Sequence, residues 1–136
     1  MQINPYLTMN GTALAALTFY ADALGGKIEG VMRFSEIPDG TEIPPGQEDR
    51  LAHGRLEFAG GSLMISDDFE DKPITYSGFN IQTDWPTVAQ AQQAFEKMAA
   101  GGTVIMPFEP TFWAAGFGML RDKFGVSWMF NCESDG

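Results

Sequence analysis

The chain has 136 residues and a formal net charge of -10, because 18 acidic residues outnumber 8 basic ones. This charge repels phosphate backbones and anionic lipid headgroups, so we expect neither nucleic acid nor a membrane surface as a partner. No apolar run approaches the roughly 20 residues that cross a bilayer, and Met1–Met9 lacks a basic segment followed by an apolar core, so we expect a cytoplasmic protein. The only cysteine, Cys132, cannot form an internal disulfide.

The first half of the chain has the pattern of one strand, one helix and three strands. Ile3–Met9 has the composition of a strand, and Thr12 is the predicted N-cap of a helix that Gly25-Gly26 ends. The predicted apolar stripe of this helix consists of Leu14, Leu17, Phe19, Ala21 and Leu24. The three strands that follow are predicted at Lys27–Phe34, His53–Phe58 and Ser62–Ser66.

Two segments lack strand or helix periodicity. Ser35–Arg50 is rich in proline, glycine and acidic residues, which predicts an exposed and mobile loop. Asp67–Ser77 holds four acidic residues and Lys72-Pro73, which is typical of a linker.

After this linker the same order of elements begins again. Gly78–Thr83 is predicted as a strand, and Asp84-Trp85-Pro86 as the start of a helix that Gly101-Gly102 ends. The predicted buried face of this helix consists of Val88, Ala91, Phe95 and Met98. The last three strands are predicted at Thr103–Phe108, Phe117–Arg121 and Ser127–Cys132.

The repeat is also visible in matched residues. Phe19 and Phe95 each lie six positions before a Gly-Gly pair, and Met32-Arg33-Phe34 corresponds to Met106-Pro107-Phe108. Gly60-Gly61-Ser62-Leu63-Met64 similarly corresponds to Gly125-Val126-Ser127-Trp128-Met129. Any one match is also explained by glycine as generic turn punctuation, but several in the same order indicate an internal duplication.

These segments resemble a known family. Asn4–Leu7, Phe19–Gly26, Gly101–Pro107 and above all Thr111–Met129 are similar to the PhnB-like branch of the glyoxalase/bleomycin-resistance (vicinal oxygen chelate) superfamily. The resemblance implies one α+β domain over residues 1–136, with two tandem βαβββ modules at 1–66 and 78–133 and a linker at 67–77. It also implies that the curled mixed sheets of the modules form a cavity, and that the protein is a homodimer.

In metal-using members of this superfamily, His, Gln or Glu side chains on the first and last strands of the modules hold one divalent ion. The resemblance places the corresponding positions near Tyr6, Met64, Phe79 and Met129, none of which is a good ligand for a hard or borderline ion. We therefore expect neither a metal nor another cofactor. A shift of one or two residues would instead bring up Asn4, Asn80, Asn131 or Glu133.

The only histidine, His53, shares one strand face with Arg55 and Glu57. This face either lines a pocket or is the solvated face of an edge strand, with a surface ion pair between Arg55 and Glu57. Large, soft side chains are abundant, and they either fill the core or line a ligand site. The candidate ligand-binding residues are Tyr6, His53, Arg55, Met64, Phe79, Trp113, Phe117, Met119, Trp128 and Met129.

Because strand side chains alternate, Trp128 and Met129 cannot both point inward, and Met129 is the better candidate for the wall of a cavity. A binding protein for a small apolar or aromatic molecule is the function that this pattern favours. The alternative is an enzyme, either a metal-dependent lyase, isomerase or dioxygenase, or a metal-free catalyst that uses His53 or Tyr6. A purely structural dimer is a third hypothesis. Some PhnB-like relatives are described as ubiquinone-type methyltransferases, but no glycine-rich strand-to-helix loop supports that activity here.

Overall fold

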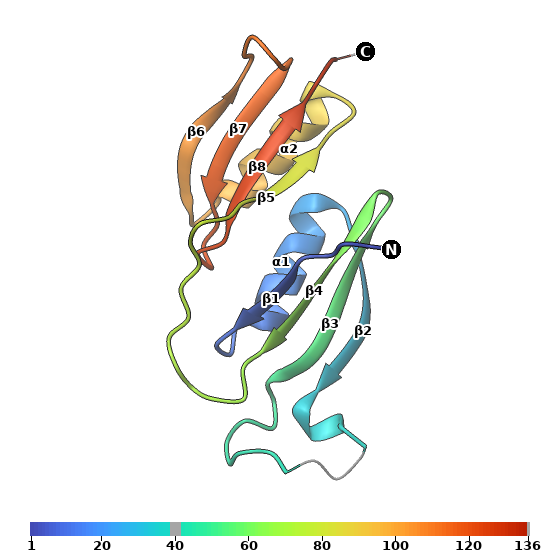
Figure 1. Ribbon diagram of the computed structural model, residues 1–136, viewed down its shortest axis with the longest axis vertical. Helices are drawn as coiled ribbons and strands as arrows, with labels where there is room; N and C mark the ends of the chain where they lie inside the picture. Colours follow the sequence, from blue (N-terminus) through green and yellow to red (C-terminus); the bar gives the residue numbers. More distant parts are fainter. Residues whose placement is uncertain (39–41, 136) are drawn as a thin grey trace. The chain divides into compact units, whose positions relative to one another are not determined.

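The computed structural model describes residues 1–38 and 42–135 (Figure 1). The chain divides into two compact units, unit 1 from Met1 to Ile74 and unit 2 from Thr75 onward. Both units have the element order βαβββ, so the predicted α+β class and the predicted duplication of one module are confirmed. Neither described helix is long and apolar enough to cross a membrane.

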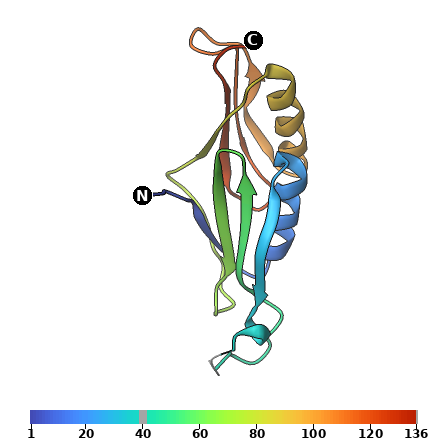
Figure 2. The same ribbon diagram turned by 90° about the vertical axis from the view of Figure 1, so that its right-hand side faces the viewer.

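Unit 1 is a four-stranded sheet with one helix on one of its faces. The order of the strands is β1-β4-β3-β2, where β1 is parallel to β4 and the other neighbours are antiparallel. Its elements are β1 (Tyr6–Met9), α1 (Ala13–Leu24), β2 (Lys27–Arg33), the 3-10 turn η1 (Phe34–Glu36), β3 (Leu51–Phe58) and β4 (Gly61–Asp67). Helix α1 packs against β3, β4 and β2 (Figure 2).

The two ends of helix α1 are capped in different ways. Thr12 occupies the N-cap position but makes no capping hydrogen bond with its side chain. The buried carboxylate of Asp67 replaces it and accepts hydrogen bonds from the Gly11 N–H (2.8 Å) and the Ala13 N–H (3.0 Å). At the other end, Gly25 adopts a left-handed φ of 80°, and its N–H donates to the Ala21 carbonyl. The predicted glycine stop and the predicted N-cap position of Thr12 are thus confirmed, but the capping hydrogen bonds go to Asp67 and not to the threonine side chain.

The buried face of α1 differs from the predicted stripe. Its fully buried residues are Ala13, Ala16, Leu17, Tyr20 and Ala23. Of the predicted stripe only Leu17 belongs to this set, while Phe19 and Ala21 are half-buried at its margin. The reason is that the buried face follows the helical spacing i, i+3, i+4 and i+7 from Ala13, which includes Leu17 and Tyr20 but not Phe19 or Ala21.

Unit 2 repeats the same architecture. The order of its strands is β5-β8-β7-β6, with β5 parallel to β8 and the remaining pairs antiparallel. Its elements are β5 (Ile81–Asp84), α2 (Val88–Ala99), β6 (Thr103–Glu109), β7 (Gly116–Arg121) and β8 (Ser127–Cys132). Helix α2 covers one face of this sheet, and its buried residues are Ala91, Ala94, Phe95 and Met98.

The start of α2 corrects the sequence-based prediction. Thr87, and not Asp84-Trp85-Pro86, is the N-cap, because its side-chain oxygen accepts a hydrogen bond from the Gln90 N–H at 3.2 Å. Trp85 instead stacks on Phe130 with the ring centroids 5.8 Å apart and anchors the segment between β5 and α2.

A second buried carboxylate fixes the turn between β7 and β8. Asp122 is 3% exposed, and it accepts hydrogen bonds from the Phe124 N–H, the Val126 N–H and the Trp128 indole N–H at 2.8 to 3.1 Å. It serves unit 2 as Asp67 serves unit 1, where a third donor, the Leu51 N–H, reaches Asp67 at 2.9 Å. Each unit therefore buries one carboxylate with three N–H donors.

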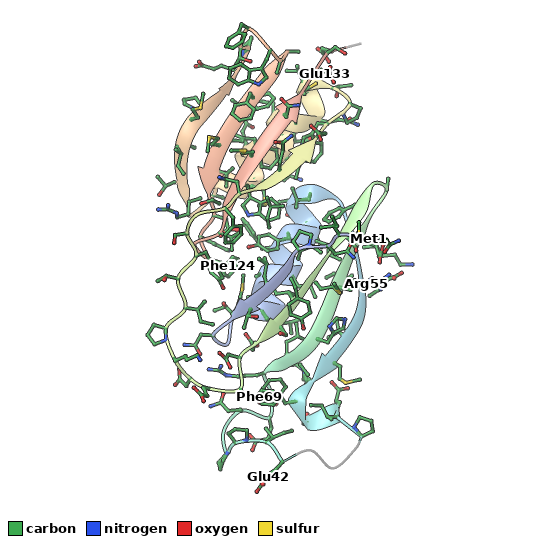
Figure 3. All side chains as sticks on the ribbon, in the orientation of Figure 1. Met1, Glu42, Arg55, Phe69, Phe124 and Glu133 are labelled. Atoms are coloured by element: carbon green, nitrogen blue, oxygen red, sulfur yellow. The ribbon has the colours of Figure 1, made fainter. Side chains whose placement is uncertain are left out.

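The two irregular segments of unit 1 are partly anchored. Phe34, directly before the predicted mobile loop, is buried and stacks on Phe69 of the connecting segment with the centroids 4.7 Å apart. Arg50, at the end of the loop, donates hydrogen bonds to the carbonyls of Asp68 and Glu70. Phe69 and Glu42 are labelled in Figure 3. The mobility of the loop stays a prediction, and its residues 39–41 lie outside the described part of the chain.

Candidate functional site

Each sheet has one face covered by its own helix and one helix-free face. Alternation along the strands sorts the side chains, so that Leu7, Leu56, Leu63 and Ile65 of unit 1 are buried on the helix side. The residues that lie between them in sequence are on the helix-free face and are exposed or half-buried. The candidate site residues have to be located with respect to these two faces.

The helix-free face of unit 1 carries a row of four residues across all four strands. Strand pairing aligns Tyr6 with Met64, Met64 with Arg55, and Arg55 with Glu29. Tyr6 is 50% exposed, and its ring centroid lies 6.2 Å from that of His53. Four of the predicted ligand residues, Tyr6, His53, Arg55 and Met64, are therefore brought together on one face.

This face of unit 1 is polar. Arg55, labelled in Figure 3, forms a hydrogen-bonded ion pair with Glu57, and Lys27 forms an ion pair with Glu29 at 3.4 Å. The structure also decides the position of His53, because β3 has a paired strand on both sides and is not an edge strand. His53 is half-buried between strand neighbours, within reach of a molecule that covers the face.

The helix-free face of unit 2 has the same plan with different side chains. One row aligns Gln82 with Met129, Met129 with Met119, and Met119 with Met106. The neighbouring row consists of Asp84, Asn131, Phe117 and Glu109. In that row the Asn131 amide donates to the Asp84 carboxylate at 3.0 Å. The face thus combines thioethers and an aromatic ring with a few polar groups.

An aromatic cluster borders this face. Trp113 is 48% exposed, and its ring packs edge-on against Phe117 with the centroids 5.4 Å apart. The turn that carries Trp113 is held by the Thr111 hydroxyl, which accepts hydrogen bonds from the Trp113 N–H and the Ala114 N–H. The indole is therefore held in place while a large part of its surface stays accessible.

Two predicted ligand residues lie elsewhere. Trp128 is 1% exposed on the helix side of β8, and its indole N–H donates to Asp122. Phe79 precedes β5, which begins only at Ile81 and not at Gly78, so Phe79 has no paired position in the sheet. Neither residue belongs to the helix-free faces on which the other candidates gather.

Sequence reasoning missed Gln82, Asp84 and Met106. Their place on the helix-free face follows from strand register, which sets them opposite Met129, Asn131 and Met119. The repeat in the sequence could have located these residues. Ser62 and Ser127 align β4 with β8, and the position of β5, the first strand of unit 2, then follows from the distance between β1 and α1 in unit 1.

The donor set does not fit the divalent ion of metal-using superfamily members. The paired first and last strands present Tyr6 beside Met64 in unit 1 and Gln82 beside Met129 in unit 2. A phenol and two thioethers bind hard or borderline divalent ions poorly, so the Gln82 amide oxygen is the one suitable ligand among these four side chains. Within residues 1–38 and 42–135, no group of three or more His, Cys, Asp or Glu side chains is arranged to hold a metal ion.

Comparisons with known proteins agree with this architecture. The family described as Glyoxalase/Bleomycin resistance protein/Dioxygenase superfamily matches residues 2–130. Protein YjdN of Escherichia coli (strain K12) is 34% identical, over 96% of this chain and 95% of YjdN. The crystal structure of protein PA1353 from Pseudomonas aeruginosa is 40% identical, with a TM-score of 0.89 and 99% of both chains covered.

A third similar structure comes from Bacillus cereus and is described as a putative 3-demethylubiquinone-9 3-methyltransferase, PhnB protein. It is 25% identical, with a TM-score of 0.80 over 97% of this chain and 99% of that chain. The predicted resemblance to PhnB-like proteins is thereby confirmed. The chain belongs to the Glyoxalase/Bleomycin resistance protein/Dioxygenase superfamily and has its fold of two βαβββ units.

Proposed function

We propose that this protein binds a small apolar or aromatic molecule on the helix-free face of unit 2, without the divalent metal ion of its catalytic relatives. One observation carries the proposal. Trp113 is held edge-on against Phe117 at 5.4 Å and still exposes 48% of its surface, and Phe117 belongs to the row next to the methionines. An ordered aromatic ring that stays accessible is a ready contact for a planar ligand.

The chemistry of the face fits such a ligand. Binding sites for small molecules are mostly apolar, with a few polar groups that set orientation. Met119 and Met129 provide adaptable apolar contact, and Asp84 with Asn131 provides an acceptor and donor in the next row. Each aromatic pair that a ligand ring forms is worth about 0.5 to 1.5 kcal/mol beyond area burial.

Tryptophan fluorescence tests the proposal, because Trp113 differs from the other two tryptophans. Trp128 is buried, and Trp85 is stacked on Phe130 with its indole N–H bonded to Thr83 at 2.7 Å. A panel of aromatic compounds should include a short-chain quinone, because the Bacillus cereus structure is described as a putative 3-demethylubiquinone-9 3-methyltransferase.

We expect a bound compound to quench Trp113, and Trp113→Phe to abolish the quenching. Affinity measured by calorimetry should fall about tenfold in Trp113→Ala, which corresponds to about 1.4 kcal/mol. Tyr6→Ala in unit 1 is the matched control for loss of an exposed aromatic ring. Binding that survives Trp113→Ala unchanged would place the ligand elsewhere.

The absence of a divalent ion is tested separately. We expect the purified protein to carry no stoichiometric zinc, iron, nickel or manganese, and chelators to leave its Tm unchanged. One equivalent of such an ion surviving dialysis against a chelator would favour the metal-dependent lyase, isomerase or dioxygenase instead.

We also expect a symmetric homodimer. Both sheets leave one face without a covering helix, with Tyr6 50% and Met106 38% exposed, and a twofold pair is the commonest soluble assembly. Sedimentation at micromolar concentration should give twice the mass of one chain. A monomer mass would contradict this expectation.

A further inference from the structure

Three methionines stand side by side on the helix-free face of unit 2. Met106 of β6 pairs with Met119 of β7, and Met119 pairs with Met129 of β8. Met106 is 38% exposed, and the other two are half-buried, so all three are accessible from solvent. The apolar binding proposed above does not require this alignment, since leucine or valine would supply the same contact.

The spacing of the row lets the three sulfur atoms meet. Directly paired residues on neighbouring strands have Cβ atoms about 4.5 to 5.5 Å apart. The sulfur lies two bonds beyond Cβ on an unbranched chain, so the outer methionines can lean toward the central Met119. The pairing of β6 with β7 shifts register on both sides of Met106, whereas Met119 and Met129 lie in a regular ladder. The row therefore brings three sulfur atoms to one patch of the face, where flexible side chains can turn them toward one ion.

The chemistry of thioethers selects the ion. A thioether is a soft and uncharged ligand, which suits Cu(I) and is poor for Mg²⁺, Ca²⁺ or Mn²⁺. We propose that Met106, Met119 and Met129 form a binding site for a soft monovalent cation, Cu(I). Asp84 and Glu109 in the neighbouring row add negative charge beside the cation, and the Phe117 ring lies between them in that row. This site goes beyond the proposed ligand binding, with which it shares Met119 and Met129. Only Met129 stands at a position that corresponds to the divalent site of the superfamily.

Unit 1 contains a natural comparison. Met64 has the place in unit 1 that Met129 has in unit 2, but its paired neighbours are Tyr6 and Arg55. A single thioether next to a guanidinium attracts no cation. Met64→Leu is therefore the matched control for the three methionines of unit 2.

The test is competition between the full-length protein and the chromogenic Cu(I) chelator bicinchoninate, with ascorbate to keep copper reduced. We expect about one equivalent of Cu(I) per chain and an affinity at least about tenfold lower in the triple variant Met106→Leu, Met119→Leu and Met129→Leu. Met64→Leu should bind as the unsubstituted chain does. Exchange of methionine for leucine conserves volume, and an unchanged Tm would show that the fold is intact.

The pH dependence separates thioethers from other ligands. Thioethers carry no proton at any ordinary pH, so Cu(I) binding should persist at about pH 5, where histidine and cysteine ligands are protonated. Cys132→Ser and His53→Gln should also leave binding unchanged, because Cys132 is buried on the helix side and His53 belongs to unit 1. Loss of binding at pH 5, an equal loss in Met64→Leu, or no Cu(I) uptake would overturn the proposal. These outcomes concern Cu(I) alone, because the proposed binding of aromatic compounds is tested separately by the fluorescence of Trp113.

Discussion

The helix-free faces of the two units have the same strand order but carry different kinds of side chain. Arg55 of β3 and Met119 of β7 stand at corresponding places, each paired with a methionine of the last strand, Met64 or Met129. In unit 1 the surrounding groups are ion pairs and a phenol, whereas in unit 2 they are thioethers and aromatic rings. A duplicated backbone thus provides two surfaces whose side chains are free to differ, because these side chains do not hold the fold together.

Each unit has a buried hydrogen-bonded carboxylate, although the two stand at different places in the repeat. Each unit buries one carboxylate, Asp67 or Asp122, that gathers three N–H donors. Asp67 joins the start of α1 to β3 and β4, and Asp122 closes the turn from β7 to β8 and holds the Trp128 indole. The comparison predicts that substitutions of these residues act alike in both units, while substitutions on the helix-free faces do not.

The largest effect is expected for the two buried carboxylates. Asp67→Ala and Asp122→Ala each leave three donors without their acceptor, and we expect each to lower the free energy of unfolding by about 3 to 5 kcal/mol. Urea unfolding measures this loss. Asp22→Ala is the control, because Asp22 is exposed on α1 and should change the free energy by less than about 0.5 kcal/mol. A loss in only one of the two variants would mean that the other carboxylate is not needed for the stability of its unit.

The next largest effect is expected at the second glycine of the Gly-Gly pair that follows each helix, Gly26 after α1 and Gly102 after α2. A Cβ at Gly102 would collide with the Arg121 carbonyl oxygen and would lie 3.0 Å from backbone atoms of Asp122. A Cβ at Gly26 would instead meet the ends of the Phe58 and Leu56 side chains at 2.7 and 2.9 Å, and these can move. We therefore expect Gly102→Ala to cost about 3 kcal/mol and Gly26→Ala about 1 kcal/mol.

Thermal and urea unfolding of the two glycine variants give this ranking directly. Equal losses in the free energy of unfolding would mean that the Leu56 and Phe58 side chains cannot move away from the new methyl group. A neutral Gly102→Ala would mean that the turn after β7 shifts to make room.

The sequence was sufficient to predict the elements whose ends are marked locally. Gly25 ends α1 with the left-handed φ that glycine favours, and the predicted bounds of the last strand, Ser127–Cys132, agree with β8. Alternation along that strand also correctly indicated that Trp128 and Met129 face opposite sides. Local signals of this kind need no knowledge of the partner strand.

Features that depend on distant partners could not be predicted. Asp67 resembles a linker residue in the sequence, and only the return of β4 to the start of α1 reveals it as the cap. The row that joins Gln82 to Met106 exists through register between strands far apart in the sequence, and a slip of one residue would remove it. The predicted position of Phe79 on a strand was wrong for the same reason, since β5 begins at Ile81, two residues after Phe79.

A smaller effect, on the affinity for an aromatic ligand, is expected when Phe117 loses its ring. Phe117 lies in the row next to the methionines on the helix-free face of unit 2. Phe117→Leu keeps an apolar side chain but removes the ring that Trp113 packs against. We expect affinity for an aromatic ligand to fall about two- to tenfold, corresponding to about 0.5 to 1.5 kcal/mol. Calorimetry with the best compound of the panel measures this change, and His53→Gln, the corresponding position of unit 1, should leave affinity unchanged.

The smallest effect is expected for the ion pair between Arg55 and Glu57. The side chains of Arg55 and Glu57 are 49% and 30% exposed, so water and salt screen their attraction. A double-mutant cycle with Arg55→Met and Glu57→Gln should give a coupling energy of about 0 to 1 kcal/mol, which decreases further at high salt. Measured across a range of protein concentrations, the same cycle also reports on the expected homodimer. A coupling energy above about 2 kcal/mol that appears only at high protein concentration would mean that a second copy covers this face and removes water from the pair.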